Sequence, residues 1–158
     1  MVRAREISND PSGIGGWLLV LVAMLIFTPI YATIHTILSN AAFEAKYPDF
    51  GPTWQNVKTV VWGGIILSGS LYIASAFLLI FRREISTVRL VVCAIWLAGP
   101  VNQFVGPYII AGFTTGTLDV STIIIPIMFS LVVATILTLY LCRSRRVANT
   151  YFGTAEPK

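Results

Sequence analysis

The sequence predicts an all-α membrane protein: a polytopic bundle of four transmembrane helices, with both termini on the cytoplasmic side (N-in/C-in). Three observations predict this fold. Of the 158 residues 56% are hydrophobic, only 11% are charged, and the apolar residues gather in four long stretches. Soluble domains carry about a quarter charged residues, so this composition excludes a soluble domain, and the low charge also excludes a disordered chain. We therefore expect the chain to work within lipid.

Four uninterrupted apolar stretches define the expected helices. They run over about residues 14–38, 57–81, 88–113 and 120–142. Each reaches the roughly 20 residues that a helix needs to cross the hydrocarbon core, and none holds a charged residue away from its ends. The expected organisation is a cytoplasmic N-terminal segment (1–13), a transmembrane domain (14–142) and a basic cytoplasmic tail (143–158).

The basic residues predict the orientation. Lys46 and Lys58 flank the connection between the first two stretches. The other Lys and Arg residues precede the first stretch, surround the link between the second and third, or follow the fourth: Arg3, Arg5, Arg82, Arg83, Arg89, Arg143, Arg145, Arg146 and Lys158. Because cytoplasmic loops carry an excess of Lys and Arg, both termini and the middle loop are predicted to be cytoplasmic. The net charge of +4 thus marks sidedness, and we expect no nucleic-acid partner.

The longest predicted connection is an external loop over residues 39–56. Its stretch 47–54 is rich in turn formers and aromatic residues. Two interpretations stay open. The loop is either a compact cap resting on the bilayer surface or an ordinary linker, since loops favour Pro and Gly for backbone reasons alone.

The third stretch carries the most informative polar residues. Gly99-Pro100 and Gly106-Pro107 repeat at a spacing of seven, with Asn102 and Gln103 between them. At helical spacing the glycines and the amides lie near one face, and lipid does not tolerate amides, so we expect this face to point inward. One interpretation is a kinked packing helix whose amides bond to a neighbour. The other is a discontinuous helix whose polar groups line a small site.

A second packing signal lies in the stretch before it. Gly64 and Ser68 form a pair of small residues four positions apart, which lets two helix backbones approach closely. The pattern leaves open whether the partner is the third helix or another subunit.

Residues that carry chemistry are scarce. His35 is the single histidine, so neither a metal site nor a bis-histidine haem has enough ligands. Cys93 and Cys142 form no CxxC motif, and we expect them to pack as buried small residues. No nucleophile with a base and no pair of acids can be assembled. We therefore expect no enzyme, no catalytic residues, no metal and no cofactor.

Two segments carry a resemblance to a known family. They are Gly13-Ile14-Gly15-Gly16-Trp17-Leu18-Leu19 before the first stretch and Ser144-Arg145-Arg146-Val147-Ala148-Asn149-Thr150-Tyr151-Phe152 after the fourth. Together they resemble the bacterial inner-membrane family of the domain of unknown function 2569, with its Gly-Gly-Trp-Leu start and four predicted membrane helices. Tyr151 departs from the family pattern, which more often runs directly from Thr to Phe. The resemblance implies the four-helix fold and the inner membrane, and no activity.

The positions marked by this resemblance gather at the expected inner interface. A candidate contact surface there comprises Gly15, Gly16, Trp17, Arg143, Arg145 and Arg146. A basic residue near an anionic leaflet contributes on the order of 1 kcal/mol, so this surface would bind lipid headgroups or a partner protein. The alternative is that the arginines only fix topology.

The expected function is that of a non-enzymatic interaction or accessory component of the inner membrane. Its contacts would be the lipid bilayer and either a membrane-protein partner or further copies of the same chain. The alternative function is a small transporter or channel with a polar path beside Asn102 and Gln103, in the third helix.

Overall fold

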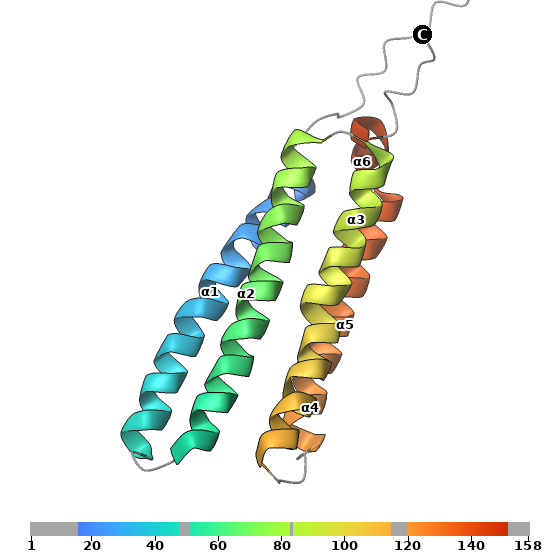
Figure 1. The fold of residues 1–158 in the computed structure, drawn as a ribbon. Helices are drawn as coiled ribbons and strands as arrows, with labels where there is room; N and C mark the ends of the chain where they lie inside the picture. Colours follow the sequence, from blue (N-terminus) through green and yellow to red (C-terminus); the bar gives the residue numbers. More distant parts are fainter. Residues whose placement is uncertain (1–15, 48–50, 83, 115–119, 152–158) are drawn as a thin grey trace, which may run out of the picture.

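The computed structural model describes residues 16–47, 51–82, 84–114 and 120–151. All regular structure in these ranges is helical (Figure 1). The helices are α1 (Trp17–Lys46), α2 (Gly51–Phe81), α3 (Ile85–Trp96), the π-helical turn η1 (Leu97–Val101), α4 (Asn102–Thr114), α5 (Val120–Arg143) and α6 (Arg145–Tyr151). Four segments are long and apolar enough to cross a membrane: Trp17–Lys46, Gly51–Phe81, Ile85–Gly112 and Ile123–Arg143. The all-α fold and four helices of spanning length are confirmed.

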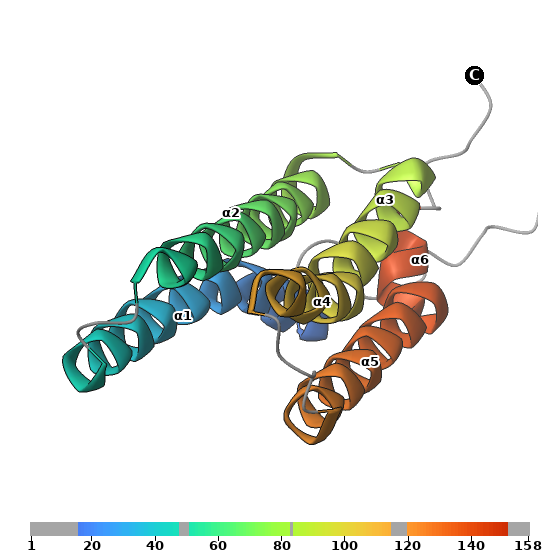
Figure 2. The same ribbon diagram turned by 60° about the horizontal axis from the view of Figure 1, so that its bottom comes forward.

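Helices that follow one another along the chain lie side by side. α1 packs chiefly against α2, which also packs against α3, η1 and α4, and these three in turn pack against α5. We call α3, η1 and α4 together the third span. Figure 2 shows α1 and α5 as the two outer helices, on different sides of the third span. The architecture is therefore a curved row of four spans with α6 against α5.

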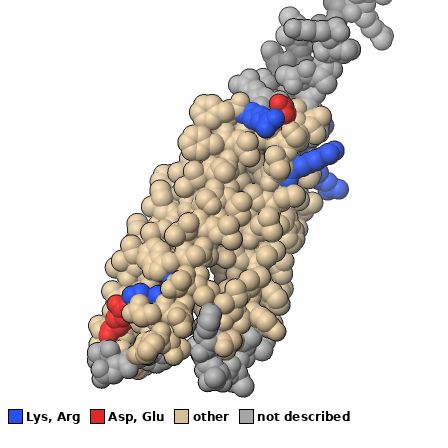
Figure 3. Space-filling view, in the orientation of Figure 1, with Lys and Arg blue, Asp and Glu red and all other residues tan. Residues whose placement is uncertain are grey.

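Charged side chains lie at the two ends of this bundle, with an uncharged zone between them (Figure 3). At one end are the described residues Glu44, Lys46 and Lys58, and at the other are Arg82, Glu84, Arg89, Arg143 and Arg145. Charge is expensive within hydrocarbon, so the uncharged zone is the part of the molecule suited to the membrane interior.

Both α1 and α2 extend into residues 39–56, which we expected as a loop. α1 continues to Lys46 and α2 begins at Gly51, so the loop prediction is wrong for most of its length. The segment after Leu38 contains Ala, Glu and Lys, which favour helix even though they end the apolar stretch. Residues 48–50 lie outside the described residues.

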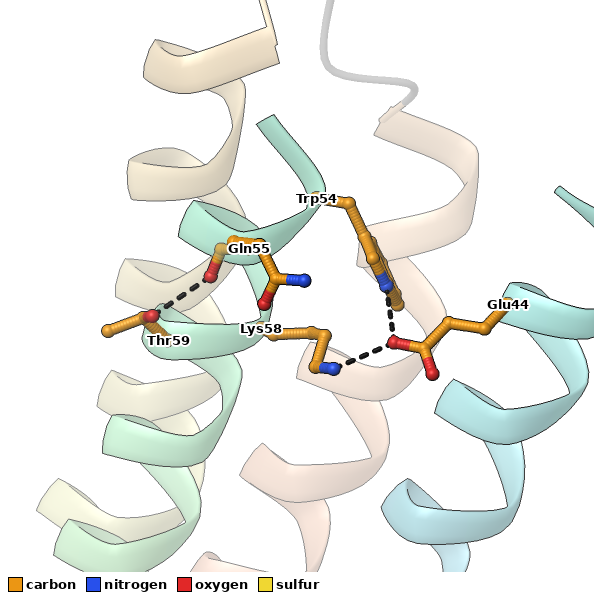
Figure 4. Close-up of polar contacts among 5 residues, drawn as sticks. All are labelled: Glu44, Trp54, Gln55, Lys58 and Thr59. Atoms are coloured by element: carbon orange, nitrogen blue, oxygen red, sulfur yellow. Dashed lines mark hydrogen bonds and ion pairs between the residues drawn. The ribbon is translucent and has the colours of Figure 1, made fainter. Parts of the chain in front are cut away.

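Polar contacts join the end of α1 to the start of α2 (Figure 4). Lys58 Nζ donates to Glu44 Oε1 over 2.7 Å, and Trp54 Nε1 donates to the same oxygen over 2.9 Å. The rings of Phe43 and Trp54 stack with their centroids 4.3 Å apart. This end of the hairpin is held by two packed helix ends, rather than by a cap formed from loop residues.

A packed core fills the end of the bundle that holds α6. Its buried members are Leu18, Leu21, Val22, Leu25, Ala76, Leu79, Val88, Val91, Ile95, Ala134, Leu141, Val147 and Tyr151. These residues come from all four spans and from α6, so the short C-terminal helix is part of the core. The side chain of Tyr151 is 1% exposed, and its hydroxyl donates a hydrogen bond to the carbonyl oxygen of Leu79.

The third span is continuous, which contradicts the alternative of a discontinuous helix. Its residues Leu97–Val101, including Pro100, form a π-helical turn between α3 and α4. Proline removes one backbone donor and its ring crowds the preceding turn, and the wider π turn accommodates both effects without breaking the helix. The expectation for the cysteines is also wrong, because Cys93 and Cys142 are both exposed on the helix surface.

Candidate functional site

All four spans line a cavity of about 690 Å³ in the middle of the bundle. All six candidate residues of the third span line it: Gly99, Pro100, Asn102, Gln103, Gly106 and Pro107. The structure thus brings this whole predicted set together on one cavity wall. Gly99 and Pro100 are buried, Asn102 is half-buried, and Gln103 is exposed to the open part of the cavity.

Hydroxyl groups from the other spans complete the polar lining. They belong to Thr28, Tyr31 and Thr36 of α1, Ser68 and Tyr72 of α2, and Ser130 of α5. No Lys, Arg, Asp or Glu occurs among the described residues that line the cavity. The cavity therefore offers uncharged hydrogen-bonding groups within otherwise apolar walls.

Small residues bring the polar groups close together. A Cβ atom added at Gly99 would lie 2.9 Å from Ser130 Oγ and 3.3 Å from the Tyr72 hydroxyl, and one added at Gly64 would lie 3.1 Å from Asn102 Oδ1. Gly64, one of the two small residues of the α2 pattern, therefore packs against the third span of the same chain. Since Asn102 follows Gly99 by about one helical turn, these groups form one polar cluster.

Two exposed aromatic side chains lie at the rim of the cavity. Tyr31 is 70% exposed near the middle of α1, and Phe129 is 71% exposed near the middle of α5. Both line the cavity, and they belong to the two outer helices of the row. The cavity thus opens sideways between α1 and α5, at a depth that corresponds to the middle of the spans.

His35 also lines the cavity, at the end away from the core. Its Nδ1 lies 3.5 Å from Ser39 Oγ, and its ring lies 5.9 Å from that of Tyr31. Within the described residues no group of three His, Cys, Asp or Glu side chains is placed to hold a metal ion.

A comparison with protein families assigns the chain. The model of a protein family of unknown function, DUF2569, matches residues 11–152. The chain belongs to this family. No curated protein and no solved structure matches the sequence. Membership confirms the resemblance seen at the two ends of the chain and extends it over the spans, cavity included.

The two segments that resemble the DUF2569 pattern lie at the same end of the bundle. Gly16 precedes α1 with a φ of 54°, and Trp17 is 74% exposed. Arg143 and Arg145 are exposed beside α6, while Gly15 and the side chain of Arg146 lie outside the described residues. The structure thus places the described members of the candidate contact surface at one end of the molecule.

The terminal segment contributes more to the interior than we expected. Val147 and Tyr151 are fully buried and Thr150 is 4% exposed, so one face of α6 packs into the core. Tyr151, which departs from the DUF2569 pattern, is one of the largest buried side chains. The spacing of Val147, Thr150 and Tyr151 by three and four residues was the available signal for an amphipathic helix.

Proposed function

We propose that this DUF2569 protein is a non-enzymatic component of the membrane that binds a small molecule in the cavity beside Asn102 and Gln103. The observation that carries the proposal is the cavity of about 690 Å³ with its convergent amides and hydroxyls. Ligand sites typically measure roughly 300–1,000 Å³ and combine apolar walls with a few polar groups. The described lining supplies amides and hydroxyls for hydrogen bonding and one imidazole, with no carboxylate or thiol to pair with it, so it offers binding groups and no acid–base pair.

The proposed location is the bacterial inner membrane, with both termini in the cytoplasm. The uneven distribution of basic residues supports this orientation. Among the described residues, the α6 end carries Arg82, Arg89, Arg143 and Arg145, and the opposite end carries Lys46 and Lys58 (Figure 3). The sequence adds Arg3, Arg5, Arg83, Arg146 and Lys158 to the richer side.

The basic end also supports an accessory role. Exposed Arg143 and Arg145, at the same end of the bundle as the exposed Trp17, are suited to contact anionic headgroups, a membrane-protein partner or a second copy of the chain. Replacing Arg143, Arg145 and Arg146 together with Gln is expected to lower the amount of phosphatidylglycerol that the purified protein retains. Unchanged topology, lipid retention and partner recovery would remove this part of the proposal.

A transport function is the second candidate, and the position of the cavity favours it. Asn102 and Gln103 line a space to which all four spans contribute, as a solute path requires. The core at the α6 end closes that path, so transport would need the spans to separate there. Solute movement into liposomes that is abolished by Asn102→Ala would support transport, and solute movement unaffected by that substitution would count against it.

Ligand binding is best tested with a pair of glycine variants on one helix. Gly106 lines the cavity and Gly112 does not, and an added Cβ meets nothing within 4 Å at either position. Gly106→Leu should therefore narrow the cavity, and its Cβ has room there, while Gly112→Leu should leave the cavity unchanged.

The readout is the set of small molecules that remain bound after purification in polymer nanodiscs, identified by mass spectrometry. A compound retained by the native protein and by Gly112→Leu, and depleted in Gly106→Leu, would be the cavity ligand. Identical small-molecule profiles for all three proteins would overturn the proposal.

A further inference from the structure

We infer that the cavity takes a neutral amphiphile with a single acyl chain, which enters sideways from the bilayer between α1 and α5. This inference rests on the proposed function, because it names the chemical class of the molecule bound there. Three features carry it: the uncharged lining, the position of the opening, and the arrangement of polar and apolar walls.

The lining predicts a ligand without charge. Among the described residues, every polar side chain of the cavity carries an amide, a hydroxyl or an imidazole. A buried charge without a partner is strongly unfavourable, and a phosphate, carboxylate or ammonium group would find no Lys, Arg, Asp or Glu among the described lining residues. Amides and hydroxyls both donate and accept, which suits the hydroxyl and ester groups of a neutral head.

The opening predicts entry from the lipid phase. Tyr31 and Phe129, both strongly exposed, lie near the middle of the two outer helices, at the depth of the hydrocarbon in a spanning molecule. At the α6 end, the buried core closes the bundle, with Leu18 and Leu79 fully buried. A molecule dissolved in the bilayer reaches the rim directly, whereas one from the α6 side would first have to part the core.

The walls predict the shape of the ligand. The Tyr72 and Ser130 hydroxyls meet beside Gly99, close to Asn102, and together they form the hydrogen-bonding side. Along α5 the lining residues Phe129, Val133 and Leu137 recur every four positions, which places them in one apolar strip. A polar head would bond to the cluster while one chain follows this strip. A cavity of about 690 Å³ is of the size that holds a drug-like molecule, too small for the two chains and headgroup of a phospholipid.

Photolabelling can test all three features. The probe is a monoacylglycerol with a diazirine on its acyl chain, added to the full-length protein in vesicles of phosphatidylethanolamine and phosphatidylglycerol. After irradiation, mass spectrometry maps the label. We expect label on lining residues such as Phe129 and Val133, a reduction of about ten-fold in Gly106→Leu and unchanged labelling in Gly112→Leu.

Competition defines the ligand class. Unlabelled monoacylglycerol should displace the probe at about a tenth of the concentration that lysophosphatidylglycerol requires, because the two differ by a charged phosphate. Equal competition by both would overturn the inference of neutrality. Label restricted to residues outside the lining, and insensitive to Gly106→Leu, would overturn entry through the side opening.

The outcome separates this inference from the proposed function. If nanodisc mass spectrometry finds a charged or water-soluble compound that depends on an open cavity, the protein binds a ligand and the inference is wrong. If no bound compound is depleted in Gly106→Leu and the probe labels no residue of the cavity lining, the proposed function itself fails.

Discussion

Gly99 lies where three spans approach one another closely. A methyl group there would press on Ser130 Oγ at 2.9 Å and on the Tyr72 hydroxyl at 3.3 Å. Overpacking of this kind typically destabilises by about 1–3 kcal/mol, so we expect Gly99→Ala to lower the free energy of unfolding by that amount. The measurement is the thermal midpoint of unfolding in detergent. Gly112→Ala, where an added Cβ meets nothing within 4 Å, should change stability by less than about 0.5 kcal/mol.

A double variant tests the cause assigned to this loss. Ser130→Ala removes the oxygen nearest to the added methyl group, so the pair Gly99→Ala and Ser130→Ala should recover part of the stability that Gly99→Ala loses. Strictly additive effects of the two substitutions would show that the clash with Ser130 is not the cause.

Tyr151 satisfies a backbone group at the end of α2. That helix ends at Phe81, so the carbonyl of Leu79 belongs to the last four, which an α-helix leaves without a helical partner. The Tyr151 hydroxyl donates to it in a fully buried setting. We expect Tyr151→Phe to destabilise the protein by about 1–3 kcal/mol in a denaturation titration, because an acceptor stays buried without its donor. Tyr108, which is 69% exposed, supplies the control, and Tyr108→Phe should leave the midpoint unchanged.

At the residue scale, the sequence predicted the amide face and missed the hydroxyls. Asn102 and Gln103 are costly in lipid, and their helical spacing to the two glycines indicated a shared inward face. A hydroxyl side chain does not indicate which face of its helix points inward, because it can bond to a carbonyl of its own helix. Ser68, for example, donates to the carbonyl of Gly64 over 2.8 Å. Tyr72 and Ser130 therefore enter the site only through the packing of the spans.

At the scale of single helices, hydropathy located the spans and misplaced two of their ends. α1 passes beyond Leu38 because helix propensity and contacts with α2, such as the Glu44–Lys58 ion pair, continue where apolar residues stop. Between a break and a continuous helix, the third span takes the continuous form, with a π turn at Leu97–Val101. Propensity and spacing alone do not decide which of these conformations a proline adopts.

The connection between α2 and α3 contains Glu84, and its contacts predict the direction in which its pKa is shifted. The Ser86 hydroxyl donates to Glu84 Oε2 over 3.0 Å, and Arg82 Nε lies 3.2 Å from the same oxygen. Both interactions favour the carboxylate, the bond from Ser86 most, and they hold the pKa of Glu84 below its ordinary value of 4.5. Because the folded pKa is lowered, these contacts stabilise the connection at pH values above 4.5 and are lost as pH falls through the folded pKa.

Carbon NMR of labelled Glu side chains measures this directly. The titration midpoint of Glu84 should lie below 4.5, and Ser86→Ala should raise it towards that value. The Glu44 signal, from the opposite end of the molecule, provides the control and should not move. A Glu84 midpoint that Ser86→Ala leaves unchanged would contradict the assigned cause.

At the scale of the whole molecule, the cavity follows from the order of the spans. α1 packs chiefly on α2, and α5 packs on the third span. The row is therefore curved, and α1 and α5 at its two ends do not close it into a ring. The sequence indicated four spans and one inward polar face. It did not indicate which pairs of helices pack against each other and which stay apart. That depends on close approaches such as Gly69 to Pro29, where an added Cβ would lie 3.3 Å from the proline ring.

The orientation of the whole bundle gives the last prediction. Cys93→Ala and Cys142→Ala first remove both native thiols, and then Gln55→Cys or Ala148→Cys places one exposed thiol at either end. Because basic residues concentrate at the α6 end, that end should face the cytoplasm. A membrane-impermeant maleimide added to intact cells should therefore label Gln55→Cys and should reach Ala148→Cys only after permeabilisation. The opposite labelling pattern would place the arginines outside the cytoplasm. It would therefore rule out the proposed contact of Arg143 and Arg145 with the cytoplasmic leaflet. The proposed entry of a ligand between α1 and α5 does not depend on orientation and would still stand.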